Sequence, residues 1–529
     1  MPALTTPPDI ALPRAVPPTS APLAAPRRTP APPVASRRRP SALALLLVVA
    51  AFGLRVWSLG TSSLWLDEAL IILRASESLW TAVAGRTAVD LEPPLYPLLL
   101  RLWQPLGAPD FWARFLSVAF ATLAVAVLLR LSNRRVGYAA AAIMAFAPTQ
   151  VYYAQEATVY GLVALLSAGL LVAADGAAHG RRRGWLAFAA FAVAAIHTYY
   201  GLVFLVVGLD AWLLARRWRG DAPPGVSTRA LLVGHAVVVL AWLPLLPLAL
   251  RQSNAVVDVW WGRYGQINGW QTINLFVNGA THDGLLFPVF AFSSPPLWFL
   301  IALMALLLVG AGYRPGWFVG GWLLPLLLAY LASVIGRYPF GARYLLIVAP
   351  VVYALLGTAI VEGTARLAQP GARRVRPALA RSMRTTAMLI ALVVLASGLP
   401  SGGLTRVWPD STPHSSVRDI LLAVGAQRRA TDAIFVTYGA SPVAQVYQAQ
   451  GITPPDAVLD EGWPAGRIDA QASRILAAAR DHARVWVVVA LARPGEEEAL
   501  ASALARRGAW LRQRVTAPGT TALLFDLAP

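Results

Sequence analysis

The sequence predicts a polytopic α-helical membrane protein of about eleven spans with a small C-terminal α/β domain. Hydrophobic residues make up 57% of the 529 residues and charged residues only 13%, against about 25% charge in a typical soluble domain. Several apolar runs reach about 18 to 20 residues, long enough to cross a bilayer as a helix. Beyond residue 400, short strand and helix patterns alternate instead, which indicates an α/β domain.

Charge and cysteine content limit the classes of function. The formal net charge is +19, every basic residue is Arg, and there is no Cys. The arginines cluster in short loops between apolar runs, which favours the positive-inside pattern of membrane topology over nucleic-acid binding. No nucleic-acid-binding signature is present. The absence of Cys excludes disulfides, a thiol nucleophile and a Cys-based metal site.

The first 40 residues are rich in Pro, Ala and Thr and end in three consecutive arginines. Such a segment predicts a disordered cytoplasmic tail, followed by an uncleaved anchor rather than a signal peptide. We expect the transmembrane region to occupy 41–400. Its spans are predicted at roughly 41–59, 112–130, 136–150, 158–174, 185–199, 200–215, 229–248, 296–312, 316–335, 343–360 and 385–400.

Loop charge predicts the orientation of these spans. Counted from a cytoplasmic N-terminus, the inside loops hold the Arg clusters and the outside loops are poorer in Arg. The pattern predicts that residues 401–529 lie outside a plasma membrane. The preference for Arg over Lys is typical of a GC-rich bacterial genome.

Two predicted outside loops are long. Residues 60–111 carry the adjacent carboxylates Asp67 and Glu68, and their amphipathic part at 68–84 is expected to form one helix along the membrane interface. Residues 249–295 are rich in aromatic side chains, including Trp260 and Trp270. This pattern is typical of an interfacial belt, and a lid over a lipid site is the alternative.

The C-terminal domain is expected at 401–529. Strands are predicted at 432–438, 485–491, 510–516 and 520–526, and helices at 442–450, 468–482 and 495–508. The region contains no Gly-rich phosphate-binding spacing, so a nucleotide site is not expected.

Several motifs then occur in a fixed order. They are Arg55, S-L-W-L-D-E-A at 63–69, E-P-P-L-Y-P-L-L-L at 92–100, A-R-F-L-S at 113–117, Y-Y-A-Q-E-A-T-V-Y-G at 152–161 and R-Y-P-F-G-A-R-Y-L-L-I-V-A-P at 337–350. Together they resemble the GT-C superfamily of lipid-linked-sugar glycosyltransferases, over roughly residues 45–360. The resemblance is greatest to the family-39 and RgtA/B/C/D-like group, which includes relatives of the protein mannosyltransferases and of the aminoarabinose transferases acting on lipid A.

The resemblance implies a function. It implies transfer of a hexose or pentose from a polyprenyl-phosphate carrier to a glycan, lipid or protein acceptor outside the membrane, with inversion and without a cofactor. One alternative is a lipid-linked-glycan flippase or transporter, which would predict inverted repeats with broken helices. No such duplication is visible in the sequence. The other is a non-catalytic glycan-binding membrane protein, which would not need the acidic pair.

The resemblance makes Asp67 the candidate general base, because it matches the first acidic position of the family's Asp-Glu motif. Sugar transfer from an activated phosphate donor needs a carboxylate that takes the acceptor's proton. Glu68 would then orient the acceptor or share the proton. The structural alternative is an exposed helix N-cap at Asp67 with Glu68 in the first turn.

A second candidate group lies at other predicted outer edges of the membrane. Glu156 is the further catalytic candidate, and Tyr153 and Gln155 beside it suit sugar hydroxyls. The alternative is an ordinary span end with aromatic anchors. His197 and Tyr199 fall at another outer edge, where a lone His is more often structural and no second His stands at metal spacing.

Arginines complete the predicted site. Arg in hydrocarbon costs at least about 2.5 kcal/mol, so each should have a partner or water. Arg337, Arg343 and the adjacent Tyr344 are expected to hold the leaving phosphate, whereas Arg55 and Arg114 are expected to pair with the acidic loop. Snorkelling to the headgroups is the alternative.

One departure from the family pattern concerns metal. Relatives often have His before the Pro-Pro pair, where this sequence has Glu92. Asp90 and Glu92 form an Asp-x-Glu pair that could ligate a hard cation. Two carboxylates alone rarely build a cation site, and the resemblance implies no metal, so a solvated turn is the preferred interpretation.

Overall fold

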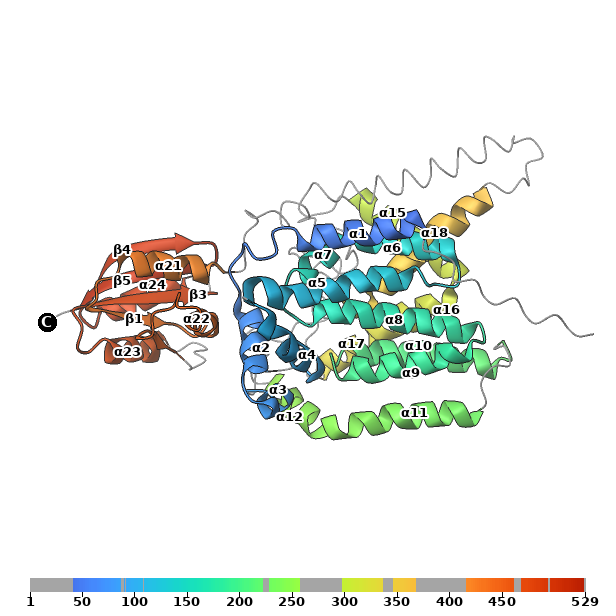
Figure 1. Cartoon of the computed structure of the whole chain (residues 1–529), viewed down its shortest axis with the longest axis horizontal. Helices are drawn as coiled ribbons and strands as arrows, with labels where there is room; N and C mark the ends of the chain where they lie inside the picture. Colours follow the sequence, from blue (N-terminus) through green and yellow to red (C-terminus); the bar gives the residue numbers. More distant parts are fainter. Residues whose placement is uncertain are drawn as a thin grey trace, which may run out of the picture. The chain divides into compact units, whose positions relative to one another are not determined.

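The computed structural model describes residues 41–86, 90, 92–107, 109–221, 228–256, 297–335, 346–367, 415–460, 468–492 and 495–527. Within these residues the chain forms a body of helices and a five-stranded sheet flanked by helices (Figure 1). The predicted tail at 1–40, the aromatic segment around Trp260 and Trp270 and the expected span at 385–400 lie outside the described residues.

Helices occupy every expected span that falls in the described part of the chain. They are α1 (Ala42–Val56), α5 (Pro109–Leu128), α6 (Arg134–Phe146), α7 (Pro148–Ala154), α8 (Tyr160–Ala178), α9 (Arg182–Ile196), α10 (Leu202–Trp218), α11 (Thr228–Trp242), α12 (Leu246–Val256), α15 (Leu297–Tyr313), α16 (Pro315–Phe318), α17 (Leu324–Val334) and α18 (Ala349–Leu367). Five stretches of the described chain are each long and apolar enough to cross a membrane: Pro109–Leu128, Tyr160–Ala178, Thr228–Asn254, Pro315–Val334 and Leu346–Arg366. The protein is therefore a multi-pass helical membrane protein.

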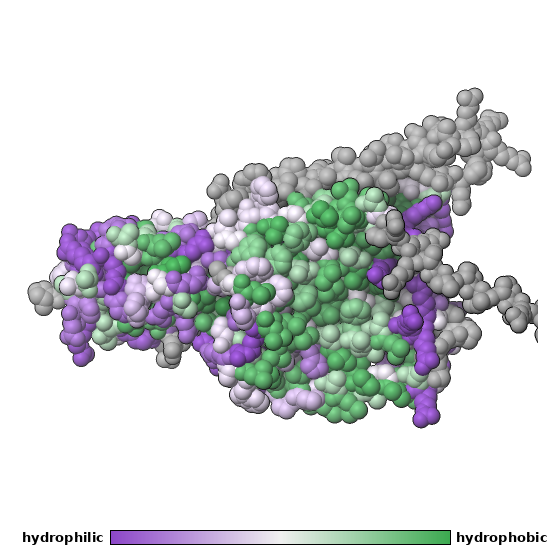
Figure 2. Space-filling view, viewed as in Figure 1, coloured by the Kyte–Doolittle hydropathy of each residue, from purple (hydrophilic) through white to green (hydrophobic). Residues whose placement is uncertain are grey.

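Helix α8 forms the centre of the helical body and packs against α5, α9, α10 and α18. Small residues allow these backbones to approach closely. A Cβ atom at Gly161 would clash with the Ser117 backbone of α5, and one at Gly184 of α9 would clash with Ala177 of α8. This is the packing expected where lipid supplies no hydrophobic driving force between helices. Figure 2 shows hydrophobic residues over the surface of the helical body and mainly hydrophilic ones over the sheet domain.

The arginine-rich loops of the described chain gather at one end of the helical body. A hollow of about 470 Å³ there is lined by His179 after α8, Arg216 and Arg219 at the end of α10, and Arg314 before α16. Helix α8 ends at this side, so its start at Tyr160 marks the opposite end. The alternation of Arg-rich and Arg-poor loops in the sequence thus corresponds to two ends of one bundle.

Between α1 and α5 the chain forms α2 (Leu66–Ser76), α3 (Leu79–Ala84) and α4 (Leu95–Trp103). The prediction of one interfacial helix over 68–84 is wrong, because Glu77 is extended and Ser78 caps a new helix by accepting a hydrogen bond from the Thr81 amide at 3.0 Å. Helix α2 packs on α4 and on a helix of the C-terminal domain. Its buried residues are Leu66, Glu68, Ala69, Ile71, Ile72, Arg74 and Ala75.

The C-terminal region contains a mixed five-stranded sheet in the order β2-β1-β3-β5-β4. The strands are β1 (Asp432–Val436), β2 (Val458–Leu459), β3 (Arg484–Ala490), β4 (Ala509–Ala517) and β5 (Thr520–Leu527). Strands β2, β1 and β3 are parallel, and β5 and β4 are antiparallel to their neighbours. The predicted strands match β1, β3, β4 and β5, while β2 was not predicted. The expected boundary at residue 401 lies outside the described residues.

Helices cover both faces of this sheet. The helices are α21 (Val417–Gln427), α22 (Ser441–Gln448), α23 (Ile468–Ala478) and α24 (Glu496–Ala505). Because strand side chains alternate, Ile434 and Trp486 pack with α21 and α22, whereas Phe435 and Val487 pack with α23 and α24. Helices α22, α23 and α24 were predicted, whereas α21 was not.

Candidate active site

The adjacent carboxylates Asp67 and Glu68 begin helix α2. Trp65 is the N-cap residue, so Asp67 is the second residue of the helix and Glu68 the third. The N-cap interpretation of Asp67 is therefore wrong, although a carboxylate in the first turn is still favoured by the helix dipole. Asp67 is half-buried, whereas Glu68 is fully buried. The pair thus consists of two carboxylates in different environments.

Glu68 is enclosed by donors from three parts of the chain. Arg114 Nε donates to its Oε1 at 2.7 Å and Arg114 Nη2 to its Oε2 at 2.7 Å, which is a bidentate ion pair. The Ala157 amide donates to Oε1 at 2.8 Å and the Trp65 amide to Oε2 at 3.2 Å. Because Glu68 has no exposed surface, the expectation that it contacts the acceptor is not met. It joins the start of α2 to α5 and to the segment before α8.

Arg114 also holds the chain that leads to Asp67. We call residues 59–68 the acidic loop. Arg114 Nη1 donates to the carbonyls of Leu59 at 3.2 Å and Ser62 at 2.9 Å, and Nη2 donates to that of Ser63 at 2.9 Å. The expected pairing of Arg114 with the acidic loop is present, and it fixes the loop backbone as well as Glu68.

Arg55 behaves differently from the prediction. It is fully buried, and its guanidinium donates to the carbonyls of Ala51 at 3.0 Å, Ala145 at 2.9 Å and Met144 at 2.9 Å. The expected pairing of Arg55 with the acidic loop is therefore corrected: Arg55 joins the end of α1 to the last turn of α6. Carbonyls at a helix end lack intrahelical partners, which makes them suitable acceptors for a buried cation.

The segment between α7 and α8 lies close to the same end of α1. The Gln155 side-chain amide donates to the carbonyls of Arg55 at 3.3 Å and Trp57 at 2.8 Å. This amide nitrogen therefore serves the fold, in contrast to its expected use on sugar hydroxyls. Glu156 is 6% exposed and precedes Ala157, the residue that binds Glu68. The Asp-Glu motif and the Y-Y-A-Q-E-A motif thus meet in space.

Aromatic side chains extend this region. The rings of Tyr153 and Tyr160 meet edge to face at 5.0 Å between centroids, and those of Tyr160 and Tyr199 at 6.3 Å. His197 Nδ1 lies 2.8 Å from the Val193 carbonyl, and the His197 carbonyl accepts from the Leu95 amide at 2.8 Å. His197 therefore joins the start of α4 to the end of α9.

The Asp90–Glu92 region forms a turn fixed by surrounding donors. The Arg86 amide donates to Asp90 Oδ2, and the Gln252 side chain donates to the carbonyls of Asp90 and Glu92. Arg74 Nη1 donates to the Glu92 carbonyl at 2.9 Å. Among the described residues, no group of three or more His, Asp or Glu side chains has a metal-binding arrangement. This geometry agrees with the preferred interpretation of a turn.

Some site residues fall outside this description, and others were missed. Arg337, Arg343 and Tyr344 lie outside the described residues, so phosphate binding by them stays a prediction. Sequence reasoning missed Asp110, which lies one turn before Arg114 on α5 and binds the C-terminal domain. The i, i+4 spacing of the two was the available signal.

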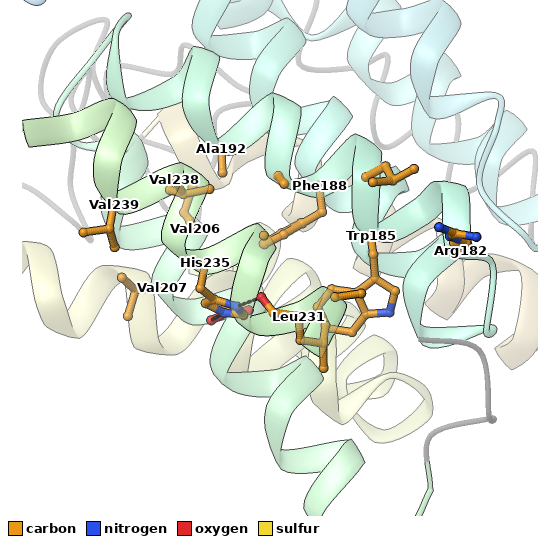
Figure 3. A pocket seen from close by; sticks show the side chains of 15 residues that line it. Arg182, Trp185, Phe188, Ala192, Val206, Val207, Leu231, His235, Val238 and Val239 are labelled. Carbon is orange, nitrogen blue, oxygen red and sulfur yellow. Dashed lines mark hydrogen bonds and ion pairs between the residues drawn. The ribbon is translucent and has the colours of Figure 1, made fainter. Parts of the chain in front are cut away.

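A separate groove of about 530 Å³ lies between α9, α10 and α11 (Figure 3). Its walls are mainly apolar, with Trp185 and Phe188 from α9 and Val238 from α11. Asp210 of α10 and His235 of α11 form a hydrogen bond of 2.8 Å inside it. None of the residues that line this groove belongs to the acidic loop or to 153–160. The polar pair joins α11 to the helical body.

We expect Asp210→Ala and His235→Ala each to lower the melting temperature of the purified protein slightly. Hydrogen bonds between membrane helices contribute about 0.6 kcal/mol on average and up to about 1.7 kcal/mol. A double-mutant cycle measured by thermal unfolding in detergent checks this. The loss in the double variant should be smaller than the sum of the two single losses, and strict additivity would contradict the pairing.

Comparison with known proteins follows from this geometry. No family model and no curated protein matches the sequence. Solved structures do match. ArnT from Cupriavidus metallidurans, in the apo state, aligns with a TM-score of 0.56 at 15% sequence identity, over 92% of this chain and 98% of its own. The chain has a GT-C glycosyltransferase fold.

A second structure supports the GT-C fold. The archaeal oligosaccharyltransferase AglB from Archaeoglobus fulgidus, in complex with an inhibitory peptide and a dolichol-phosphate, aligns with a TM-score of 0.53 at 13% identity. The alignment covers 91% of this chain and 73% of AglB. The resemblance seen in the motifs is thus matched by the fold, for the GT-C superfamily as a whole.

Proposed function

We propose that this protein is a GT-C glycosyltransferase that transfers a sugar from a polyprenyl-phosphate carrier to an acceptor outside the membrane. The observation that carries the proposal is the contrast between Asp67 and Glu68 within a fold shared with ArnT and AglB. Glu68 is enclosed and bound by Arg114 and two backbone amides, whereas Asp67 beside it keeps partial exposure. Asp67 is therefore the carboxylate of the pair that a substrate reaches.

In the proposed reaction the acceptor hydroxyl attacks the anomeric carbon while the bond from that carbon to the phosphate oxygen breaks. The acceptor's proton passes to Asp67, and the polyprenyl phosphate leaves with the bond electrons. The net products are the glycosylated acceptor and the free lipid phosphate. Attack opposite the leaving group inverts the anomeric centre. The dolichol-phosphate bound to AglB supports a lipid phosphate as the donor's carrier.

The other residues take supporting roles in this proposal. Glu68 and Arg114 position Asp67 by fixing the first turn of α2 and the acidic loop. Tyr153, Tyr199 and Glu156 line the neighbouring region as candidates for contact with the sugar or acceptor. Arg337, Arg343 and Tyr344 remain the candidates for the phosphate, because Arg binds phosphate oxygens in a bidentate manner.

The orientation follows from the two ends of the bundle. Arg-rich loops mark the cytoplasmic side of a bacterial plasma membrane, and the described Arg216, Arg219 and Arg314 meet at one end. The acidic loop and the start of α8 lie at the other end, which we assign to the outside. The acceptor is then a glycan, lipid or protein of the cell envelope.

The test is a transfer assay with purified protein in vesicles, using polyprenyl-phosphate-linked hexoses and pentoses and a cell-envelope extract as acceptor. We expect sugar to appear on the acceptor together with an equal amount of free polyprenyl phosphate, measured by mass spectrometry. If the sugar-linked lipid instead crosses the bilayer without release of polyprenyl phosphate, the protein is a flippase. If it binds glycan and does neither, it is a non-catalytic receptor.

A further inference from the structure

Tyr447 joins the C-terminal domain to the acidic loop. It is on α22, is fully buried, and its hydroxyl accepts a hydrogen bond from the Leu64 amide at 2.8 Å. The same hydroxyl donates to Asp110 Oδ1 at 2.7 Å. Burial and the neighbouring Asp110 carboxylate raise the pKa of Tyr447, so the phenol keeps the proton that it donates. One hydroxyl therefore binds the loop and α5 together.

Arg418 of α21 makes a second set of contacts with the same loop. Its amide donates to Ser63 Oγ at 3.1 Å, and its guanidinium Nη1 donates to the Gly60 carbonyl at 3.5 Å. The guanidinium also bonds to the Thr61 carbonyl and forms an ion pair with Asp110 Oδ2 at 3.2 Å. Both oxygens of Asp110 are thus bound by the C-terminal domain.

The acidic loop is held from its other side by α5. Arg114 binds the carbonyls of Leu59, Ser62 and Ser63, as well as the Glu68 carboxylate. Asp110 and Arg114 are four residues apart, which places them one above the other on the same face of the helix. Helix α5 therefore contacts the C-terminal domain through Asp110 and the start of α2 through Arg114.

We infer that Tyr447 and Arg418 are positioning residues for Asp67, so that the C-terminal domain is part of the catalytic apparatus. The inference rests on the proposed function of Asp67 as the base. Leu64, which Tyr447 binds, is three residues before Asp67, and the intervening chain enters α2 directly. A displacement of about 1 Å in a reacting group can lower a rate by about 10²-fold. Loss of the Tyr447 contacts should therefore slow the reaction without removing any group that touches substrate.

The test is Tyr447→Phe in the full-length protein, which keeps the ring in its buried position and removes only the hydroxyl. We expect kcat for sugar transfer to fall at least about tenfold, while KM for the donor lipid changes less than about twofold. Asp110→Asn should produce a similar loss of kcat, and the double variant should lose little more than either single variant. Arg512→Gln, on an exposed ion pair of β4 and β5, is the matched control and should leave both constants unchanged.

Hydrogen–deuterium exchange gives a second readout that needs no activity. In Tyr447→Phe, amides of the acidic loop should exchange faster, while those of β3 in the sheet core keep their protection. Unchanged exchange of the loop would overturn the inference, as would wild-type kcat in an active enzyme. If the wild-type protein transfers no sugar, the proposed function fails, and the exchange experiment still decides whether Tyr447 holds the loop.

Discussion

Replacing Asp67 with Asn should lower the rate of sugar transfer by about 10² to 10⁴-fold, the usual effect of losing a general base. Asparagine keeps the size of the side chain but cannot accept the acceptor's proton. The measurement is kcat for transfer from a polyprenyl-phosphate sugar, together with donor binding and the yield of folded protein. Binding and folding should stay close to those of the wild type, because the change removes one proton acceptor and no contact that holds the loop.

Glu156→Gln is the matched variant for this experiment. Glu156 lies next to Ala157, whose amide binds Glu68, so the two carboxylates belong to the same region. Near-wild-type turnover by Asp67→Asn combined with an inactive Glu156→Gln would move the base to Glu156. A folding defect is a poor explanation for loss of activity in Asp67→Asn. Trp65 is the N-cap residue, so the exchange removes only the first-turn charge, worth about 0.3 to 1 kcal/mol.

The helices and most strands could be predicted because their signals are local. Apolar runs gave the helical spans, and the pattern Val485 to Val489 gave the buried strand β3. Helix α21 was missed although its buried Ile420, Leu421 and Val424 follow a helical period. Strand β2 has only two residues, which is too short for any periodicity. Its pairing with β1 exists only in the assembled sheet.

The candidate site could be predicted in its residue types but not in their partners. Asp67 and Glu68 are neighbours with the same chemistry, and nothing local shows which of them is buried. That difference arises because Arg114 and Ala157, distant in sequence, converge on Glu68. Tyr447 likewise meets Asp110 across 337 positions of sequence. Such contacts follow from the packing of helices and of the C-terminal domain, which sequence patterns do not encode locally.

The second large effect is expected at the buried ion pair. Arg114→Gln should destabilise the protein by about 3 to 5 kcal/mol, because it leaves the Glu68 carboxylate enclosed without its cation. The acidic loop also loses its bonds from Arg114 to the carbonyls of Ser62 and Ser63. Thermal unfolding in detergent and the yield of monodisperse protein measure the loss. We expect little folded protein at growth temperature.

A double variant separates the ion pair from the other bonds of Arg114. Glu68→Gln with Arg114→Gln removes both charges, so it should be more stable than Arg114→Gln alone, since no uncompensated charge remains buried. It should still be less stable than the wild type, because the loop carbonyls are not restored. Arg512→Gln breaks an exposed pair and should cost no more than about 1 kcal/mol. If Arg114→Gln is as stable as this control, the Glu68–Arg114 pair does not hold the start of α2, and the positioning of Asp67 must come from the C-terminal domain alone.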